Sequence, residues 1–447
     1  MKVLDFIVSL GASVMMPIIL TILGVLLGAK FGKALRSGLT VGIGFIGLNL
    51  VIGMLSDNLG PAAQKMVERT GLNLTIIDVG WPSAAAISFA SKVGALIIPL
   101  GLVINIVMLL TRTTRTVNID IWNYWHFAFT GAMVSAATNS LVLGLVASAI
   151  DMIIVMVLAD LTGPNVEKFN GLPGVSLPHG FSAAYVPIAI IINKIIDMIP
   201  GIKDIEADPD TLQKRFGIFG EPMIIGTILG IIIGVLAGYD VKAILNVGIS
   251  MGASLVLIPK MAAMLMEGLI PISDAAQEFI QKKFKTQSKL FIGLDSAVAI
   301  GHPASMAASL VLVPITVFLA GILPGNRVLP FADLAVIPFM LCMIVPVTKG
   351  NVFRTLIIGF ICISVGLLIA TNMAPLHTQL AIDAQFAIPE GAAMIASICD
   401  GANPLVWLIL RLMETKAIGI GVLAIVAIAM AVFNYKKGHA ENKSMAA

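Results

Sequence analysis

The chain contains two copies of one segment, and both copies lie within apolar sequence. A shift of 213 residues aligns Gly80 with Gly293 (293 − 80 = 213), and the same shift aligns Asp120 with Asp333. A duplicated membrane half is typical of transporters, whose binding sites lie where the two halves meet. We therefore expect a fold built from two related halves around a shared site.

The composition points to a membrane protein. Charged residues make up 12% of the 447 positions and hydrophobic residues 58%, whereas a soluble domain carries roughly 25% charge. Runs such as 14–29, 96–110 and 223–237 are long enough to cross most of an apolar layer about 30 Å thick. Only helices close their backbone hydrogen bonds within one segment, so we expect an all-α polytopic membrane protein.

The apolar runs predict about 11 transmembrane helices. Each half has five full crossings, and because five is odd, the second half must be inverted relative to the first. The predicted spans are 8–29, 36–57, 92–111, 123–139 and 141–160, then 218–237, 241–263, 305–323, 331–348 and 352–371, and an unpaired 416–434.

Four further apolar stretches are too short or too rich in Gly and Pro to cross. These are 74–91, 170–200, 290–304 and 373–404, two in each half. We expect them to form re-entrant hairpins that leave backbone polar groups inside the membrane. Such groups are tolerated only where they line a cavity walled by protein.

Loop charges favour one orientation. If the first loop, with Lys30 and Arg36, is cytoplasmic, most other basic residues also fall inside, including Lys436 in the tail. The positive-inside rule then places the N-terminus outside and the C-terminus in the cytoplasm. No cleavable signal peptide is evident. The polar segments 58–72 and 268–287 are expected to be amphipathic helices along opposite faces.

Two ionisable residues lie in one broken stretch. A charged side chain is energetically costly inside a membrane, so such residues are candidates for a functional site. Asp295 opens the stretch and His302 follows seven residues later. Seven residues are about two helical turns, which would put both on one face. A carboxylate accepts hydrogen bonds from adjacent hydroxyls of a polyol. The alternative interpretation of Asp295 is a helix N-cap.

Histidines occur in the later broken stretch of each half. His179 and His377 are therefore expected to be rough counterparts. An imidazole donates and accepts at once, which suits a polyol hydroxyl. The alternative is a histidine that caps a broken helix.

Aromatic and acidic residues complete the candidate site. Trp81 occupies the first-half position that corresponds to the Asp295 segment, and its indole would cover the C–H face of a sugar. His126, one turn into its span, is expected to point inward. Asp78, Glu221 and Asp333 begin structural segments and are secondary candidates, with helix capping as the alternative.

Hydrolytic, nucleotide-dependent and redox chemistry lack their motifs. The sequence has no Gly-x-Ser-x-Gly, no His-Glu-x-x-His and no Walker A lysine motif. Cys342, Cys362 and Cys399 lack paired spacing and are expected to be buried small hydrophobes. We expect no metal, no cofactor and no catalytic nucleophile.

Ordered motifs along nearly the whole chain resemble the membrane component, enzyme IIC, of galactitol phosphotransferase systems. This family belongs to the ascorbate–galactitol superfamily. The resemblance is carried by motifs such as Asp78-Val79-Gly80-Trp81-Pro82, Pro178-His179-Gly180, Phe219-Gly220-Glu221-Pro222, Ile292-Gly293-Leu294-Asp295 and Leu376-His377-Thr378-Gln379-Leu380.

The resemblance implies a multi-pass permease in the bacterial cytoplasmic (inner) membrane. It would be a homodimer that moves a polyol by an elevator mechanism. Separate IIA and IIB proteins would act with it, and IIB, phosphorylated on a cysteine, would phosphorylate the substrate. By the same analogy, residues 1–73 and 218–289 are scaffold and dimerisation segments, 74–217 and 290–415 form the substrate carrier, and 416–447 form the last helix and cytoplasmic tail. The basic loops 203–215 and 282–289 are candidate docking ground for IIB.

The resulting hypothesis is a polyol site in a phosphotransferase permease. Two alternatives stay open: an ion-coupled secondary transporter in which Asp295 and His302 relay a proton, and a membrane receptor that does not transport. The predicted substrate-binding residues are Asp295, His302, His179, His377, Gln379, Trp81 and His126.

Overall fold

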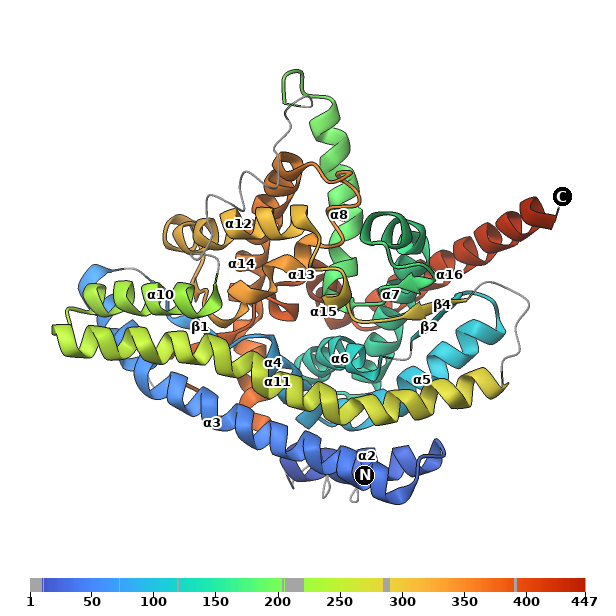
Figure 1. Cartoon of the computed structure of the whole chain (residues 1–447), viewed down its shortest axis with the longest axis horizontal. Helices are drawn as coiled ribbons and strands as arrows, with labels where there is room; N and C mark the ends of the chain where they lie inside the picture. Colours follow the sequence, from blue (N-terminus) through green and yellow to red (C-terminus); the bar gives the residue numbers. More distant parts are fainter. Residues whose placement is uncertain are drawn as a thin grey trace.

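The protein is described by a computed structural model. It covers residue 10 and residues 12–71, 73–118, 120–202, 205, 221–283, 290–389 and 392–446. Within these residues the chain is mainly helical, and two groups of helices lie on two sides of the molecule (Figure 1).

The first group contains two very long helices that lie side by side. They are α3 (Phe31–Thr70) and α11 (Val241–Lys283). Two shorter helices pack beside them, α2 (Ala12–Leu26) on α3 and α10 (Pro222–Ala237) on α11. In Figure 1 the long pair runs along one edge. The Ser37 hydroxyl of α3 donates to the Gly268 carbonyl of α11. Small residues allow this close approach, as is usual between membrane helices.

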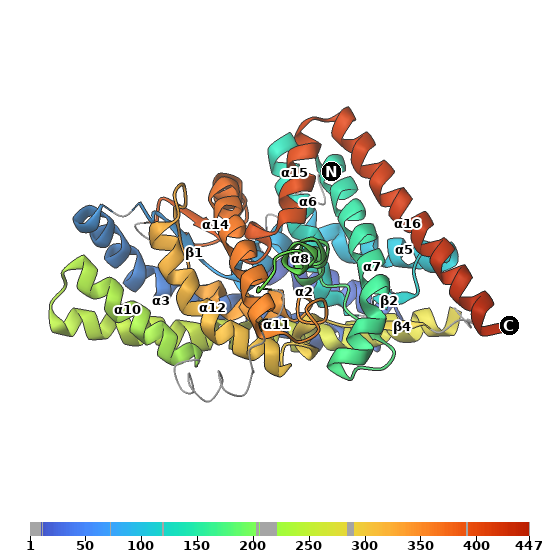
Figure 2. The ribbon, with the colours of Figure 1, turned by 90° about the horizontal axis from the view of Figure 1, so that it is seen from above.

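The second group surrounds the interior of the molecule. A pair of helices, α4 and α5, meets at 90°, and the C-terminal α16 projects beyond its neighbours (Figure 2). The helices of this group are α4 (Trp81–Ala90), α5 (Gly94–Leu110), α6 (Tyr124–Thr138), α7 (Leu141–Asn170), α8 (Gly180–Asp197), α12 (Pro303–Ile322), α13 (Ile337–Leu341), α14 (Val352–Asp383), α15 (Pro404–Glu414) and α16 (Ala417–Ala446).

Helix length and composition support a polytopic membrane protein. Among the residues that the structure describes, seven helices are long and apolar enough to cross a membrane, namely α3, α7, α8, α11, α12, α14 and α16. Helices α2 and α10 are apolar but shorter, and α4 with α5 passes the same test as one bent pair.

Several predicted boundaries are wrong. Residues 331–348 do not form a crossing: they comprise the 3₁₀ helix η4 (Ala332–Val336), the short α13 and a series of turns, mostly buried within the protein. Conversely, the predicted broken stretch 170–200 contains α8, an uninterrupted helix of 18 residues. The amphipathic segments are not separate helices, because α3 continues to Thr70 and α11 to Lys283.

The expectation of an all-α fold misses two small sheets. Both are parallel and three-stranded, in the orders β5-β1-β6 and β2-β4-β3. Their strands are β1 (Ile76–Asp78), β2 (Thr116–Asn118), β3 (Val175–Ser176), β4 (Phe291–Gly293), β5 (Val328–Leu329) and β6 (Met394–Ala396).

Each sheet combines strands from both halves of the chain. Ile77 of the central β1 aligns with Leu329 and Ile395, while Ile292 of the central β4 aligns with Val117 and Val175. The interrupted segments therefore satisfy one another's backbone groups inside the protein. Non-helical backbone at membrane depth is stable only under that condition.

A pair of buried carboxylates joins the segments that follow the β5-β1-β6 sheet. Asp78 accepts hydrogen bonds from the backbone N–H groups of Gly80 (3.1 Å), Phe331 (2.9 Å) and Asp333 (2.8 Å). Asp333 in turn accepts from the backbone N–H groups of Trp81 (2.5 Å) and Cys399 (2.9 Å). These contacts support the structural interpretation of Asp78 and Asp333.

Replacing Asp78 with Asn should destabilise the protein. A carboxylate only accepts hydrogen bonds, whereas the Asn amide group would direct N–H donors at one or more of the three backbone donors. An unsatisfied buried donor costs about 1–3 kcal/mol. We expect a clearly lower thermal unfolding midpoint in detergent. Asp383→Asn, which alters an exposed residue of α14, is the matched control, and equal midpoints for both variants would contradict this role.

The contact between α6 and α7 depends on a glycine pair. A Cβ at Gly131 would lie 2.1 Å from the Ser148 Oγ atom and 2.6 Å from the Gly144 carbonyl oxygen. Gly131→Ala should therefore separate the helices and lower the unfolding midpoint, since overpacking costs typically 1–3 kcal/mol. Gly421→Ala, in a helical position with no neighbouring atom within 4 Å, should leave the midpoint unchanged or raise it. A neutral Gly131→Ala variant would show that the helices do not pack this closely.

Candidate functional site

Polar residues follow the strands of both sheets. His179 comes after β3, Asp295 after β4 and Asp400 after β6. Parallel strands end at one edge of a sheet, and in parallel sheets that edge is where ligands usually bind. The two sheets thus direct residues from both halves of the chain toward a common region.

Four ionisable side chains form one buried chain of contacts there. The Nδ1 atom of His126 lies 2.7 Å from Oδ2 of Asp400, and its Nε2 atom lies 3.1 Å from Nε2 of His179. His179 Nε2 is also 3.5 Å from Oδ2 of Asp295. Only Asp295 is appreciably exposed, at 14% of its side chain. A buried polar group without a hydrogen-bond partner raises the free energy of the folded state. Removal of one side chain of this network would therefore leave another unpaired.

The same residues also begin helices. His179 accepts a hydrogen bond from the Ser182 N–H (3.2 Å) at the start of α8, and Asp295 accepts from the Ala297 N–H (2.7 Å) at the 3₁₀ helix η3 (Ser296–Val298). Asp120 accepts from the Asp295 N–H (3.1 Å). The capping role that the sequence offered as an alternative is therefore present, and these caps stand within the polar cluster.

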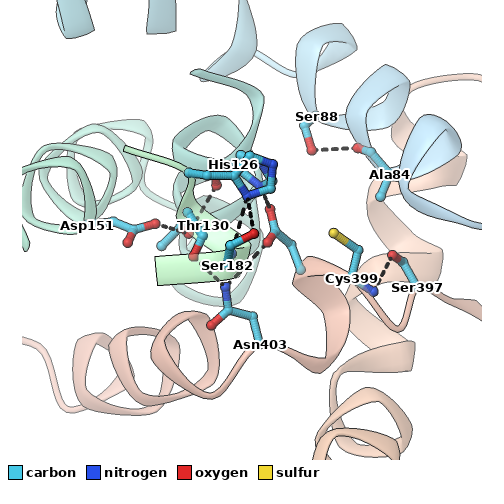
Figure 3. Close-up of polar contacts among 12 residues, drawn as sticks. Ala84, Ser88, His126, Thr130, Asp151, Ser182, Ser397, Cys399 and Asn403 are labelled. Atoms are coloured by element: carbon cyan, nitrogen blue, oxygen red, sulfur yellow. Dashed lines mark hydrogen bonds and ion pairs between the residues drawn. The ribbon is translucent and has the colours of Figure 1, made fainter. Parts of the chain in front are cut away.

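Side chains from separate helices converge on this cluster. Figure 3 shows His126 of α6, Ser182 of α8 and Asn403 at the start of α15 close together. The Ser182 hydroxyl donates to the Ser296 hydroxyl (2.9 Å), and the Asn403 amide group donates to the Gly180 carbonyl (3.1 Å). The first and second halves are thus joined by hydrogen bonds at the cluster itself.

A small cavity of about 60 Å³ adjoins the cluster. Its walls include Trp81, Trp122, Trp125, His126, His179 and Asp295. The rings of Trp81 and Trp122 meet edge to face with centroids 5.9 Å apart, and the Trp125 ring lies 4.1 Å from that of His126. Indole faces beside hydrogen-bonding groups suit a molecule with C–H faces and hydroxyls. At this volume the cavity is too small for a whole sugar alcohol, because enclosed small-molecule sites measure about 300–1,000 Å³.

The structure brings four of the seven predicted binding residues together at this cavity. These are Trp81, His126, His179 and Asp295. The predicted helix from Asp295 to His302 is wrong, because turns separate η3 from α12, and His302 caps α12 through the Ala304 N–H (3.2 Å).

The remaining two predicted residues lie on α14, away from the cavity walls. Gln379 is exposed and donates to Asp383 (2.8 Å). His377 is buried with its ring at 89° to that of Phe129, and neither ring nitrogen has a hydrogen-bond partner within the described residues. The expected break at 373 is wrong because α14 continues past Pro375 to Asp383.

The three secondary candidates lie outside the cavity walls, and one residue of the cluster was not predicted from the sequence. Asp78 and Asp333 lie behind Trp81 as a structural bridge, and Glu221 is exposed at the start of α10. Asp400, which the sequence analysis missed, precedes Gly401 after β6 as His179 precedes Gly180 after β3. That shared order of acceptor and glycine was the available signal.

One set of side chains offers metal-ligand atoms. The ligand atoms of His126, Cys399 and Asp400 lie within 4.8 Å of one another in the described part of the chain. Two of the three already bond to each other, since His126 contacts Asp400 at 2.7 Å. All three cysteines are free and buried, as expected from the sequence, and Cys399 lines the cavity.

Comparison with known proteins connects this arrangement to a family. The chain is 44% identical over 417 residues to the PTS system galactitol-specific EIIC component of Escherichia coli (strain K12). The aligned region covers 93% of this chain and 92% of that protein. The counterpart from Escherichia coli O157:H7 gives the same values. A putative permease IIC component of Escherichia coli (strain K12) is 42% identical over 433 residues, or 97% of this chain and 98% of the other.

The family profile EIIC-GAT, described as PTS system sugar-specific permease component, matches residues 6–391. This match includes strands β1 to β5 and most of the apolar helices, together with His126, His179 and Asp295 of the polar cluster, whereas β6 and Asp400 lie beyond its end. The chain therefore belongs to the EIIC-GAT family of PTS sugar-specific permease components.

Proposed function

We propose that this protein binds galactitol, or a closely related hexitol, and carries it across the bacterial cytoplasmic membrane for phosphorylation by a separate IIB protein. The observation that carries the proposal is the chain of contacts Asp400–His126–His179–Asp295 beside three tryptophans, in a chain 44% identical to a galactitol-specific component. The residues that bind the hexitol are Trp81, His126, His179 and Asp295.

The chemistry of a hexitol matches these groups. A linear polyol carries adjacent hydroxyls, each a donor and an acceptor. Asp295 accepts from such hydroxyls, and a histidine nitrogen that carries no proton accepts as well. The indole rings of Trp81 and Trp122 cover the C–H faces. Because the cavity is about 60 Å³, entry of a hexitol requires the walls to separate.

A moving carrier domain accounts for that separation. The four helices α2, α3, α10 and α11 form the scaffold and the homodimer contact, and the helices that hold the site slide against them as an elevator. Their mutual packing and the apolar crevice of about 170 Å³ between α11 and α12 support this division. The exchange of strands between the two halves supports the inverted repeat.

The proposed topology has the N-terminus outside and the C-terminus in the cytoplasm. IIB docks on the cytoplasmic face, where the basic loops 203–215 and 282–289 would offer contacts. Apart from Ile205 and the end of α11, those loops lie outside the residues that the structure describes.

Reconstituted transport tests the function as a whole. Proteoliposomes that enclose phosphorylated IIB should take up labelled galactitol and retain it as the phosphate, whereas an ion gradient alone should drive no uptake. Uptake driven by protons or sodium without IIB would identify an ion-coupled transporter instead. Galactitol-dependent thermal stabilisation without uptake under either condition would identify a receptor.

Asp295→Asn should weaken galactitol binding by about 10- to 100-fold. The reason is that hydrogen bonds to charged groups contribute about 1.5–3 kcal/mol, and the amide loses both the charge and one acceptor. Equilibrium binding of labelled galactitol to purified protein measures the effect. Asp383→Asn changes the same functional group on the exposed face of α14 and should bind normally. An Asp295→Asn affinity within twofold of that control would remove Asp295 from the site.

Cross-linking tests the sliding motion. Leu255 of α11 and Leu310 of α12 line the same crevice between the proposed domains. A short bifunctional reagent that joins cysteines at these positions, in a background with alanine at the three native cysteines, should abolish uptake. The two single-cysteine proteins serve as controls. Undiminished uptake after complete cross-linking would contradict an elevator with this domain boundary.

A further inference from the structure

His126 is held by contacts on both sides of its imidazole ring. Its Nδ1 atom lies 2.7 Å from Oδ2 of Asp400, and the other Asp400 oxygen accepts from the Asn403 amide group (3.3 Å). Asn403 is itself fixed, because its own side-chain oxygen accepts from the Leu405 N–H (2.9 Å). The imidazole therefore has one orientation, with Nε2 directed toward His179.

The hydrogen bonds assign the protons on both histidines. A backbone N–H only donates, so the 3.2 Å contact from Ser182 requires Nδ1 of His179 to accept. The His179 proton is consequently on Nε2, which faces His126 at 3.1 Å. Nε2 of His126 must then accept, so its proton is on Nδ1 and is donated to Asp400. Each ring nitrogen of His126 and His179 is then either a donor or an acceptor, and each faces a suitable partner.

This assignment leaves one base facing the cavity. His126 Nε2 carries no proton and accepts from His179 in this structure, and Asp400 stands behind the opposite nitrogen to stabilise the charge that forms when Nε2 takes a proton. His179 does not have this capacity, because one of its nitrogens accepts from the backbone and the other carries the proton. The Trp125 ring, 4.1 Å from that of His126, also favours a cationic imidazole.

We propose that His126 is the general base that accepts the hydroxyl proton when the bound hexitol is phosphorylated, and that Asp400 is its positioning residue. This inference rests on the proposed function. A hexitol hydroxyl replaces His179 as the donor to His126 Nε2, and His179 Nε2–H turns to Asp295, which lies 3.5 Å away. The arrangement follows the general logic of a nucleophile, a base and an orienting carboxylate.

The step balances in atoms and electrons. The hexitol oxygen forms a bond to phosphorus while the sulfur–phosphorus bond of the phosphocysteine on IIB breaks. The electron pair of that bond leaves with the sulfur as a thiolate, and the hydroxyl proton moves to Nε2 of His126. The proton is released to water when the product leaves toward the cytoplasm.

Single-turnover phosphoryl transfer separates this role from binding. Purified protein at saturating galactitol is mixed with IIB labelled with ³²P, and formation of galactitol phosphate is followed in time. His126→Gln should lower the transfer rate about 100-fold, because general-base catalysis contributes typically 10²–10⁴-fold. Because His126 also contacts the hexitol, its variants are compared at galactitol concentrations that saturate each protein, and galactitol should still raise the unfolding midpoint of His126→Gln.

Asp400→Asn tests the positioning role. It should lower the transfer rate with little change in galactitol affinity, while the matched surface variant Asp383→Asn should transfer at the unaltered rate. The proposal is overturned if His126→Gln transfers within threefold of the unaltered protein. It is also overturned if His126→Gln and His126→Asn both lose galactitol binding while Asp400→Asn keeps the full rate. Absence of transfer by the unaltered protein would instead contradict the proposed function.

Discussion

The structure depends on one constraint: every backbone polar group in an apolar environment must have a partner. A helix meets this requirement alone, but a chain that stops and reverses inside the molecule does not. Here the interrupted segments pair as two parallel sheets, and in each sheet a central strand from one half is flanked by strands from the other. Because neither half completes a sheet by itself, the two halves fold around each other.

The polar cluster is a consequence of that pairing. Each strand is followed by a turn and usually a helix start, where free N–H groups require an acceptor. His179, Asp295 and Asn403 supply those acceptors and thereby fix their own orientation. His179 and Asp295 also contact each other and line the cavity, so residues that cap helix N-termini also present hydrogen-bonding atoms to a ligand. Because one side chain can do both, the capping and binding interpretations of Asp295 and His179 are compatible.

Sequence reasoning succeeded where the physics is local. Low charge and long apolar runs predicted a polytopic membrane protein, and Gly, Pro and polar residues at 74–91 and 290–304 marked real interruptions. It failed where contacts with residues distant in the sequence determine the local structure. Residues 331–348 are apolar enough for a span, but they form turns whose surroundings are protein. The stretch 373–404 was expected to be broken, yet α14, which packs on α12 and α6, continues past Pro375 to Asp383. His377 consequently lies within a continuous helix and not in the broken stretch expected from the sequence.

The amino-acid sequence alone determined the class of protein, the interruptions at 74–91 and 290–304, and four of the side chains at the cavity, because hydropathy and chain breaking are properties of short segments. Only the tertiary structure decided which strands pair, that Asp400 rather than His377 stands opposite His179 across His126, and which atoms the ring nitrogens of His126 and His179 contact. These outcomes depend on contacts between residues far apart in the sequence, such as Ile76 with Met394 in the β5-β1-β6 sheet and His126 with Asp400, and such contacts arise only when the two halves close around a shared interior.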